Sequence, residues 1–487
     1  MALDEIRRER LKKLNELRVR GENPYPASVH RTLPIGEALK KFVTLARAKK
    51  KIALAGRVVA KREHGGAAFC ELKDGTGRIQ ILLKEDILGD TYSVLLRVLD
   101  IGDFLFGEGK LFKTKRGEMT LEISAARLAA KSLLPLPEKW HGLRDAEERF
   151  RKRYLDLLSN DETRERFVMR SRLIVAIRGL MEQSGFLEVE TPILQPIPGG
   201  ALARPFVTHH NALDIDLYLR VAPELYLKRL LVGGLEKVYE IGKCFRNEGI
   251  DVSHNPEFTM LECYAAYWDE EDMMKFVESF FLALVKAFGT KGAVMFDGKE
   301  IKSKKPFARI SFKELLSRYA QIIDYDRESR DSLAFCARAL GVDAEAHESK
   351  GKIADEIYKK ICRPNLLQPT FVVYHPLEIS PLAKKRDEHQ DEVRRFQLVV
   401  AGMEIMNGFA ELNDPIEQYQ RFAAQEKEGS RGGEEAHPLD EDFIEALEYG
   451  MPPAAGLGIG IDRLVMLLAD VKNIREVTLF PTMRPKV

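Results

Sequence analysis

The spacing of apolar residues changes twice along the chain and divides it into three regions. Residues 3–20 carry leucines at helical spacing among charged side chains, which predicts one amphipathic helix that ends at ENPYP, 22–26. Residues 52–128 instead show short apolar runs separated by turn sequences such as GG, DGTG and KRGE. Five short strands in so little chain predict a small closed barrel, and the OB fold is the five-stranded barrel that binds oligonucleotides. Another small β domain is the alternative.

The third region mixes helical and strand patterns after a polar, proline-broken linker at 133–150. Residues 163–184 place apolar positions on one helical face and stop at Gly185. FLEVETPIL, which follows, predicts a strand that ends at Pro192. Helices and strands then follow each other in runs rather than as regular βαβ units, which favours an α+β domain with an antiparallel sheet. The Gly-rich, charged stretch 426–442 predicts a mobile loop.

Composition is that of an ordinary globular protein. The 487 residues are 45% hydrophobic and 31% charged, and the chain is long enough for at least two domains with their own cores. Its start is charged from the fourth residue, and no apolar run approaches the roughly 18 residues that span a bilayer. We therefore expect no export signal and no membrane segment. The cysteines are scattered, and we expect buried thiols in a reducing cytoplasm: Cys70, Cys244, Cys263, Cys336 and Cys362.

Charge is distributed unevenly although the net charge is only +1. The first 62 residues hold 17 Lys or Arg against 6 Asp or Glu. A run of charge is most often a solvated face, but this one leads into the predicted barrel. The distribution favours a nucleic-acid partner for the N-terminal region without establishing one.

The stretch FRNEGIDVSHNPEFTMLECYAAY (245–267) joins two predicted strands through a polar loop. A period of two places Arg246 on one face of the first strand and Glu262 on one face of the second. Antiparallel pairing would let both side chains line one cavity. Opposite charges in a partly dry cavity are costly unless paired, so a ligand that supplies counter-charges explains them. An ion network of Arg246 with Glu248 or Glu262 alone is the alternative.

Further clusters add carboxylates and glycines to this picture. APELYLKRL places Glu224 at the start of a predicted helix. Glu404 and Glu411 lie seven residues apart, and two such carboxylates with phosphate oxygens and water suit Mg²⁺; a solvated helix face is the alternative. GLGIGIDRL (456–464) predicts a Gly-alternating strand that runs into a helix carrying Arg463. It lies too near the end of the chain for a dinucleotide fold, and no GxxxxGK[ST] sequence is present.

Together these stretches resemble the three signature motifs of class II aminoacyl-tRNA synthetases. FLEVETPIL resembles motif 1, FRNE…HNPEF motif 2 and GLGIGIDRL motif 3. A barrel before the catalytic domain is the arrangement of the subclass that serves lysine, aspartate and asparagine. GGALARPF, HPLEISPLAK and GFAELNDP are similar to segments of the bacterial-type lysyl-tRNA synthetases, and the resemblance extends from about residue 50 to Met483.

The resemblance implies a fold and an activity. The fold is α+β, with a six-stranded antiparallel catalytic sheet and helices, preceded by an OB-fold barrel that binds the anticodon. The implied domains are a helical extension, the barrel, a linker and the catalytic domain, at 1–50, 51–132, 133–150 and 151–487. The implied activity is that of a lysine–tRNA ligase, which uses ATP, L-lysine and tRNA(Lys) with Mg²⁺. A cytoplasmic homodimer without membrane contact is also implied.

The resemblance further implies roles for individual residues. ATP would contact Arg246, Glu248, His254, Asn255, Phe258, Glu404, Glu411, Gly460 and Arg463. Lysine would contact Gly200, Glu224, Arg246, Glu262, Tyr264, Asn413 and Glu417. Arg246 and Arg463 would be catalytic, and Glu404 and Glu411 would hold Mg²⁺. The anticodon would contact Arg62, Phe69 and Gln80, with a further acid near Glu118.

The implied chemistry needs no protein nucleophile, because the lysine carboxylate itself attacks the α-phosphate. Catalysis is then positioning plus charge stabilisation by Arg246 and Mg²⁺. Adenine would lie between Phe258 and Arg463, and Glu224 with the backbone of Gly200 would receive the α-ammonium. The ε-ammonium would go to Glu262 with Tyr264, because burying a cation demands a carboxylate.

Three alternatives compete with the lysine enzyme. An aspartate or asparagine enzyme of the same subclass is disfavoured by Glu262, Tyr264 and GGALARPF, since aspartate would need a cation in the pocket. A paralogue that attaches lysine to a protein usually lacks the N-terminal barrel. A non-catalytic OB-type nucleic-acid binder should have lost motif residues, whereas Arg246 and Arg463 are both in place.

Overall fold

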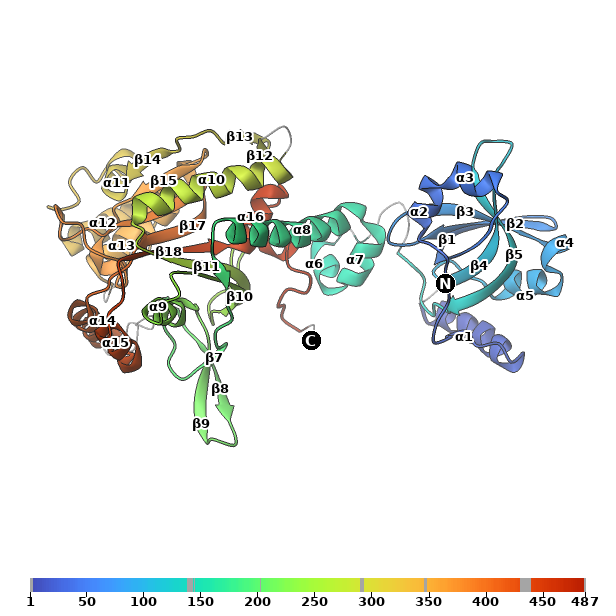
Figure 1. Ribbon diagram of the computed structural model, residues 1–487, viewed down its shortest axis with the longest axis horizontal. Helices are drawn as coiled ribbons and strands as arrows, with labels where there is room; N and C mark the ends of the chain where they lie inside the picture. The colour runs from blue at the N-terminus through green and yellow to red at the C-terminus, as the bar shows by residue number, and fades with distance from the viewer. Residues whose placement is uncertain are drawn as a thin grey trace. The chain divides into compact units, whose positions relative to one another are not determined.

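The computed structural model describes residues 3–137, 143, 145–201, 203–289, 293–345, 348–429 and 439–485. These residues form two compact units that divide between Arg144 and Asp145, inside the predicted linker (Figure 1). The end of that linker is helical, because α6 spans Ala146–Arg151 and buries Phe150 in the second unit. The first unit holds the barrel and the second the large sheet.

The first unit contains the predicted closed barrel, which has five strands within the described residues, in the order β1-β2-β3-β5-β4. The strands are β1 Lys51–His64, β2 Ala67–Lys73, β3 Arg78–Lys84, β4 Phe104–Lys113 and β5 Met119–Ala130. A two-residue turn at Gly65-Gly66 joins β1 to β2, with His64 paired to Ala67. Between β3 and β4 lie two helices that the strand pattern did not predict, α4 Glu85–Leu88 and α5 Asp90–Val98.

The N-terminal helices belong to the barrel's core. They are α1 Leu3–Val19, which confirms the predicted helix, α2 Ile35–Lys40 and α3 Phe42–Arg47. Leu17, Ile35 and Phe42 lie in one buried cluster with Leu54 of β1 and Leu72 of β2. Helices α1, α2 and α3 thus contribute to the hydrophobic core of the barrel.

The second unit is built on a sheet that, among the described residues, has eight strands in the order β14-β15-β16-β17-β18-β11-β10-β6. The strands are β14 Ala308–Ser311, β15 Thr370–Val373, β16 Arg395–Val400, β17 Met403–Ala410, β18 Ala454–Gly460, β11 Glu257–Ala266, β10 Lys237–Phe245 and β6 Leu187–Glu188. The six from β15 to β10 are antiparallel, as predicted. Parallel strands β14 and β6 extend the sheet at its two edges.

The prediction of one continuous strand in FLEVETPIL is wrong. Only Leu187–Glu188 joins the sheet, and the chain leaves it after Val189 donates its backbone N–H to the Tyr239 carbonyl at 2.9 Å. Pro192 has no N–H to continue the pairing. The chain then forms β7 Leu194–Gln195, which pairs with β9 Ile215–Leu219 and through it with β8 Phe206–His210.

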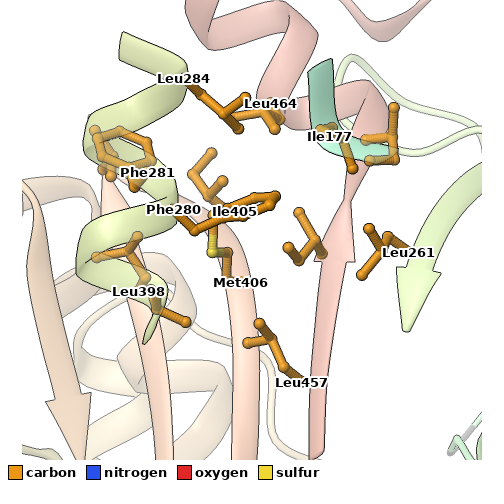
Figure 2. Close-up of a cluster of buried hydrophobic side chains, with 14 of the residues drawn as sticks. Ile177, Leu261, Phe280, Phe281, Leu284, Leu398, Ile405, Met406, Leu457 and Leu464 are labelled. Carbon is orange, nitrogen blue, oxygen red and sulfur yellow. The ribbon is translucent and has the colours of Figure 1, made fainter. Parts of the chain in front are cut away.

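Helices cover the two faces of the large sheet differently (Figure 1). On one face, α8 Asp161–Gln183, α10 Glu270–Phe288 and α16 Ile461–Leu468 enclose the main hydrophobic core. Figure 2 shows this core, in which Leu261, Met406 and Leu457 of the sheet meet Phe281 and Leu464 of the helices. On the other face, α9 Glu224–Val232 packs on β10 and β11, and α15 Glu441–Glu448 and α14 Pro415–Gly429 pack behind it.

The remaining elements extend this frame. They are α7 Arg153–Ser159, α11 Phe312–Ala320, α12 Arg330–Ala339, α13 Lys350–Ile357, and the hairpin of β12 Val294–Phe296 and β13 Lys299–Ile301. Of the predicted loop 426–442, residues 426–429 end α14 and Glu441 begins α15. Residues 430–438 lie outside the described residues. Cys70, Cys244, Cys263 and Cys362 are buried as predicted, whereas Cys336 is half-buried. Among the described helices, none combines the length and apolar character needed to cross a membrane.

Candidate active site

The candidate site lies on the sheet face that points away from the main core. Gly456 pairs with Tyr264 of β11 and Gly458 pairs with Glu262, while Leu457 between them points into the core. A Cβ on Gly456 would lie 2.1 Å from Oε1 of Glu411 and 2.5 Å from the Tyr264 ring. The glycine at this position of motif 3 therefore lets the side chains of Glu411 and Tyr264 pack directly against the backbone of β18.

Glu262 lies on this face with only 4% of its surface exposed. The Tyr264 hydroxyl donates a hydrogen bond to its Oε2 at 3.1 Å. Burial raises the pKa of Glu262 to about 8, and the negative charge of Glu224 adds to the effect. Within the described part of the chain, no cationic side chain forms an ion pair with it. A buried carboxyl of this kind can pair with a positive group that a ligand supplies.

Glu240 stands directly opposite Glu262, on β10, and like charges in that relation destabilise a sheet. Arg220 removes the conflict, because its Nη1 lies 2.5 Å from Oε1 of Glu240, and both side chains are buried. The Thr191 hydroxyl donates to Oε2 of Glu240 at 2.6 Å. A Cβ on Gly242 would fall 1.9 Å from the Arg220 guanidinium, so this glycine makes the pairing possible. Glu240 is thus satisfied within the protein, which Glu262 is not.

A buried lysine joins two of the predicted ligand-binding carboxylates. Lys228 donates from Nζ to Oε1 of Glu224, one helical turn earlier, at 2.6 Å, and its Nζ lies 2.5 Å from Oε2 of Glu411. Burial alone would lower the pKa of Lys228, but the two carboxylates outweigh burial and raise it. Gly200 lies against Glu224 as predicted, since a Cβ there would come within 2.9 Å of the Glu224 Cβ.

Arg246 and Phe258 face each other where the β10–β11 hairpin opens into its loop. The guanidinium carbon of Arg246 lies 5.1 Å from the centroid of the Phe258 ring. The backbone N–H of Arg246 donates to the Pro256 carbonyl at 2.9 Å, which continues the strand pairing up to this residue. Its Nε is buried and has no hydrogen-bond partner in the described structure. The ring and the backbone therefore fix a guanidinium whose N–H groups are available to an anion.

His254 of motif 2 and Arg463 of motif 3 come together from distant parts of the sequence. Nη2 of Arg463 lies 3.0 Å from Nε2 of His254, and Nη1 donates to the backbone carbonyl of Glu404 at 3.2 Å. Oδ2 of Asp251 lies 2.9 Å from Nδ1 of His254. Burial would raise the pKa of Asp251, but hydrogen bonds from His254 and Ser253 outweigh it and lower the pKa to about 2. An anionic Asp251 thus holds the imidazole against the arginine.

The other predicted ATP contacts occupy the same region. Asn255 is buried, and its Oδ1 has no hydrogen-bond partner among the described residues. Glu248 is exposed in the motif 2 loop. Gly460 ends β18, where a Cβ would lie 3.8 Å from the side chain of Arg463.

The two predicted metal ligands lie at the two ends of β17, so the alternative of a solvated helix face is wrong. A register shift at Ile405 directs both Ile405 and Met406 into the core and returns Glu404 to the face that carries Glu411. At about 3.3 Å per residue, roughly 20 Å of strand separates their backbones. Glu404 lies 3.8 Å from Nη1 of Arg363, whereas Glu411 contacts Lys228.

The last two predicted lysine contacts have partners within the chain. Asn413 accepts a hydrogen bond from Lys384 at 2.8 Å and donates one to the Met451 carbonyl at 3.1 Å. Oε1 of Glu417 lies 2.6 Å from Arg421 and 2.9 Å from Lys385. In this respect both differ from Glu262.

The predicted anticodon residues line one groove on the barrel, with a volume of about 530 Å³. Arg62 of β1 pairs with Phe69 of β2, and Gln80 follows on β3. The Thr120 hydroxyl donates to Oε1 of Gln80 at 2.8 Å, and Glu118 also lines the groove. The barrel thus presents a cation, an aromatic ring, an amide and a carboxylate on one surface.

Sequence reasoning missed Lys228 and Arg220. The spacing of Glu224 and Lys228, one helical turn apart, was a usable signal for an ion pair, although not for the second contact with Glu411. Arg220 had no such signal, because Glu240 follows it by 20 residues on a different element. Both side chains became visible only when the fold brought their partners together.

Comparison with known proteins finds a family for each unit. Residues 145–484 match the tRNA synthetases of class II (D, K and N). Residues 52–129 match an OB-fold nucleic acid binding domain.

Close relatives match the whole chain. The lysine–tRNA ligase of Carboxydothermus hydrogenoformans is 50% identical over 486 residues, which cover 99% of this chain and 99% of the relative. That of Moorella thermoacetica is 50% identical over 479 residues, covering 98% and 97%. The lysine–tRNA ligase of a Roseiflexus species is 48% identical over 488 residues and covers 100% of both chains.

The pKa of Glu262 generates a prediction for the ligand-free protein. Its ordinary value is 4.5 and its value in the folded protein is about 8, so between these the folded state binds more protons and stability falls as pH rises. Glu262→Gln has no proton to lose at this position. As pH rises from about 5 to about 8, we therefore expect the unfolding free energy of the variant to rise relative to that of the wild type by a few kcal/mol. Thermal unfolding at both pH values measures the gain.

The matched control is Glu257→Gln, at an exposed position of the same strand. It should follow the wild-type pH dependence. If the unfolding free energies of Glu262→Gln and the wild type change by the same amount with pH over this range, the raised pKa of Glu262 is refuted.

Proposed function

The chain belongs to the class II tRNA synthetases of the D, K and N type, and on that premise we propose that it is a lysine–tRNA ligase. It activates L-lysine with ATP to lysyl-adenylate and transfers the lysyl group to the 3′ end of tRNA(Lys) in the cytoplasm. The observation that carries the choice of lysine is Glu262, a buried carboxyl beside Tyr264 with no cationic partner in the described structure. An aspartate enzyme would need a cation at this position instead.

In this proposal each charge of lysine meets an opposite charge. The ε-ammonium pairs with Glu262 and donates a hydrogen bond to the Tyr264 hydroxyl oxygen. Its positive charge favours the ionised form of the Glu262 carboxyl, which burial keeps protonated in the free protein. The α-ammonium pairs with Glu224, beside the backbone of Gly200. The carboxylate meets the guanidinium of Arg246. Asn413 and Glu417, which follow Glu411 along the chain, complete the wall of the lysine site.

ATP binds where motifs 2 and 3 meet, at the contact of His254 with Arg463. Adenine lies between the Phe258 ring and the guanidinium of Arg463. The phosphates lie near Arg246, which Phe258 already holds in place. The remaining contacts come from Glu248, His254, Asn255 and the backbone at Gly460. The Oδ1 of Asn255 is buried and without a partner among the described residues, so it can accept a hydrogen bond from ATP. The contact of His254 with Arg463 holds these two side chains in place.

The reaction follows from this placement. An oxygen of the lysine carboxylate forms a bond to the α-phosphorus of ATP, while the bond from that phosphorus to the pyrophosphate oxygen breaks and pyrophosphate leaves. Arg246 stabilises the charge that grows on the α-phosphate, because its N–H groups are aimed before the substrates react. The 3′ hydroxyl of tRNA then attacks the lysyl carbonyl carbon, and AMP leaves. Positioning by the chain supplies most of the acceleration.

Mg²⁺ accompanies ATP in this proposal, and the donor set fits it. The ion prefers oxygen ligands, with one or two carboxylates and the rest from phosphates and water. Oε1 of Glu411 is buried without a hydrogen-bond partner among the described residues, while Oε2 contacts Lys228. Glu404 lies at the other end of β17, too far away to share one ion with Glu411, so each carboxylate would hold its own ion. No group of three or more His, Cys, Asp or Glu side chains in the described ranges converges as a metal site. When bound, the ion neutralises phosphate charge and acts as a Lewis acid.

We further propose a homodimer. Exposed apolar side chains occur within motif 1, on β8 and on α8: Leu187, Ile193, Leu194, Val207 and Val175, with exposed fractions of 45–68%. An exposed apolar surface of this kind marks a protein interface, and a symmetric pair buries the same patch twice. The molar mass in solution tests this, and a monomer at assay concentrations would exclude it.

Amino-acid-dependent exchange of pyrophosphate into ATP tests the activity. We expect lysine to support exchange, and Glu262→Gln to raise the KM for lysine by about 30- to 1000-fold, or roughly 2–4 kcal/mol, because a desolvated cation loses its charge partner. The KM for ATP should change little. Glu257→Gln serves as the control for the loss of a charge on this strand. Exchange supported by another amino acid but not by lysine would overturn the function, and unchanged lysine kinetics in Glu262→Gln would overturn the role of Glu262.

The barrel groove generates a prediction for tRNA. The lysine anticodon is rich in uridine, and an aromatic ring such as Phe69 stacks on a base while Gln80 reads a base edge and Arg62 meets the backbone. Phe69→Ala should weaken tRNA charging by about 1–3 kcal/mol, the usual contribution of one stacked base, and leave pyrophosphate exchange intact. Phe104→Ala, on β4 and outside the groove lining, is the control. Equal losses in charging and exchange would argue against anticodon contact.

A further inference from the structure

Lys228 has no assigned role in lysine activation, yet it lies between the two halves of the site. Its side chain is fully buried, and its ammonium contacts Glu224 at the start of α9 and Glu411 just after β17. The Phe409 ring of β17 lies 5.4 Å from Nζ. Glu224 belongs to the lysine half of the site and Glu411 to the ATP half. One ammonium thus connects both.

The surroundings of Lys228 carry more negative than positive charge. Glu262 and Tyr264 face the cluster from β11. Arg395 of β16 is the other cation near Glu224, but its guanidinium already donates to Asn407 at 3.0 Å and to Ser380 at 2.9 Å. Lys228 is therefore the cation that contacts Glu224 and Glu411 directly.

Stability alone does not explain such an arrangement. Replacing buried ion clusters by apolar side chains of similar volume is often neutral or stabilising, so a fold gains little by burying a lysine with two acids. The acids are needed if ligands bind to them. A fixed ammonium then keeps two neighbouring carboxylates from repelling each other before any ligand arrives.

We propose that Lys228 is a positioning residue, which holds Glu224 ready for the α-ammonium of lysine and aligns Glu411 in the ATP half. The hydrogen bond uses Oε1 of Glu224, so the second oxygen remains for the substrate. The inference rests on the proposed function, because the ligand of Glu224 is taken to be lysine. It adds that the two halves of the site are built around one shared cation.

Lysine binding measured by calorimetry without ATP or metal tests the proposal. Lys228→Met keeps most of the side-chain length and removes the charge, and we expect about 10- to 100-fold weaker binding, because Glu224 loses the partner that orients it. Lys228→Arg keeps a cation that can reach both acids and should restore much of the affinity. Arg229→Met is the matched control, since Arg229 is the next residue of α9 and pairs with Asp440 instead.

The steady-state constants provide a second readout. Lys228→Met should raise the KM for lysine and also the KM for ATP, whereas Glu262→Gln should raise the KM for lysine alone. Binding or KM values equal to the wild type in a folded Lys228→Met variant would overturn the proposal. Tighter lysine binding would also overturn it, because Lys228 would then compete with the substrate for Glu224.

A double variant covers the case in which Lys228→Met does not fold. Adding Glu411→Gln removes one of the two acids that Lys228 contacts. The double variant should therefore be more stable than Lys228→Met alone, while its lysine binding stays weak. If the losses of stability caused by the two substitutions simply add, the ammonium does not balance the charge of Glu411, and the proposal is overturned. A wild-type protein that binds no lysine would instead refute the proposed function.

Discussion

The site depends on one unfavourable burial, that of the Glu262 carboxyl without a cation in the described structure. Burying a charge is costly, and this cost raises the pKa of Glu262 to about 8. In the proposed complex, a lysine side chain brings the missing charge to a carboxyl that is already buried. Neutral side chains do not reverse the cost, and acidic ones increase it. Selectivity for a cation therefore follows from an energy that the protein carries before the ligand binds.

The rest of the fold keeps that carboxyl in place and removes competing charges. The core face of the sheet is packed against α8, α10 and α16, so the candidate site lies on the other face. Asp462 at the start of α16 accepts a hydrogen bond from the Thr259 backbone of β11 at 2.7 Å and contacts Arg170 of α8 at 2.6 Å. This ties motif 3 to the strand that carries Glu262. Arg220 and Lys228 neutralise the neighbouring acids, so Glu262 is left as the receptor.

Much of this was predictable from sequence, for reasons that particular elements make clear. The barrel strands and the β10–β11 hairpin follow from alternation and turn residues, and Gly456 with Gly458 marked a strand needing space. Prediction failed where structure depends on distant partners. The bulge at Ile405 places Glu404 on the opposite face of the sheet from the one that simple alternation predicts. The segment at Pro192 leaves the large sheet and joins a second one. The contact of Lys228 with Glu411 joins residues 183 positions apart. Candidate site residues were predicted through motif resemblance, but the counter-ions of Glu240, Glu224 and Glu411 were not.

Proton release on lysine binding tests the central claim most directly. At about pH 7 the free site holds a proton on Glu262, and the arriving ammonium should displace it. Calorimetry of L-lysine binding in buffers with different ionisation enthalpies should therefore show release of about one proton per site, and close to none for Glu262→Gln. Tight lysine binding by the wild type without proton release would mean that Glu262 is already ionised in the free protein, and would contradict the account.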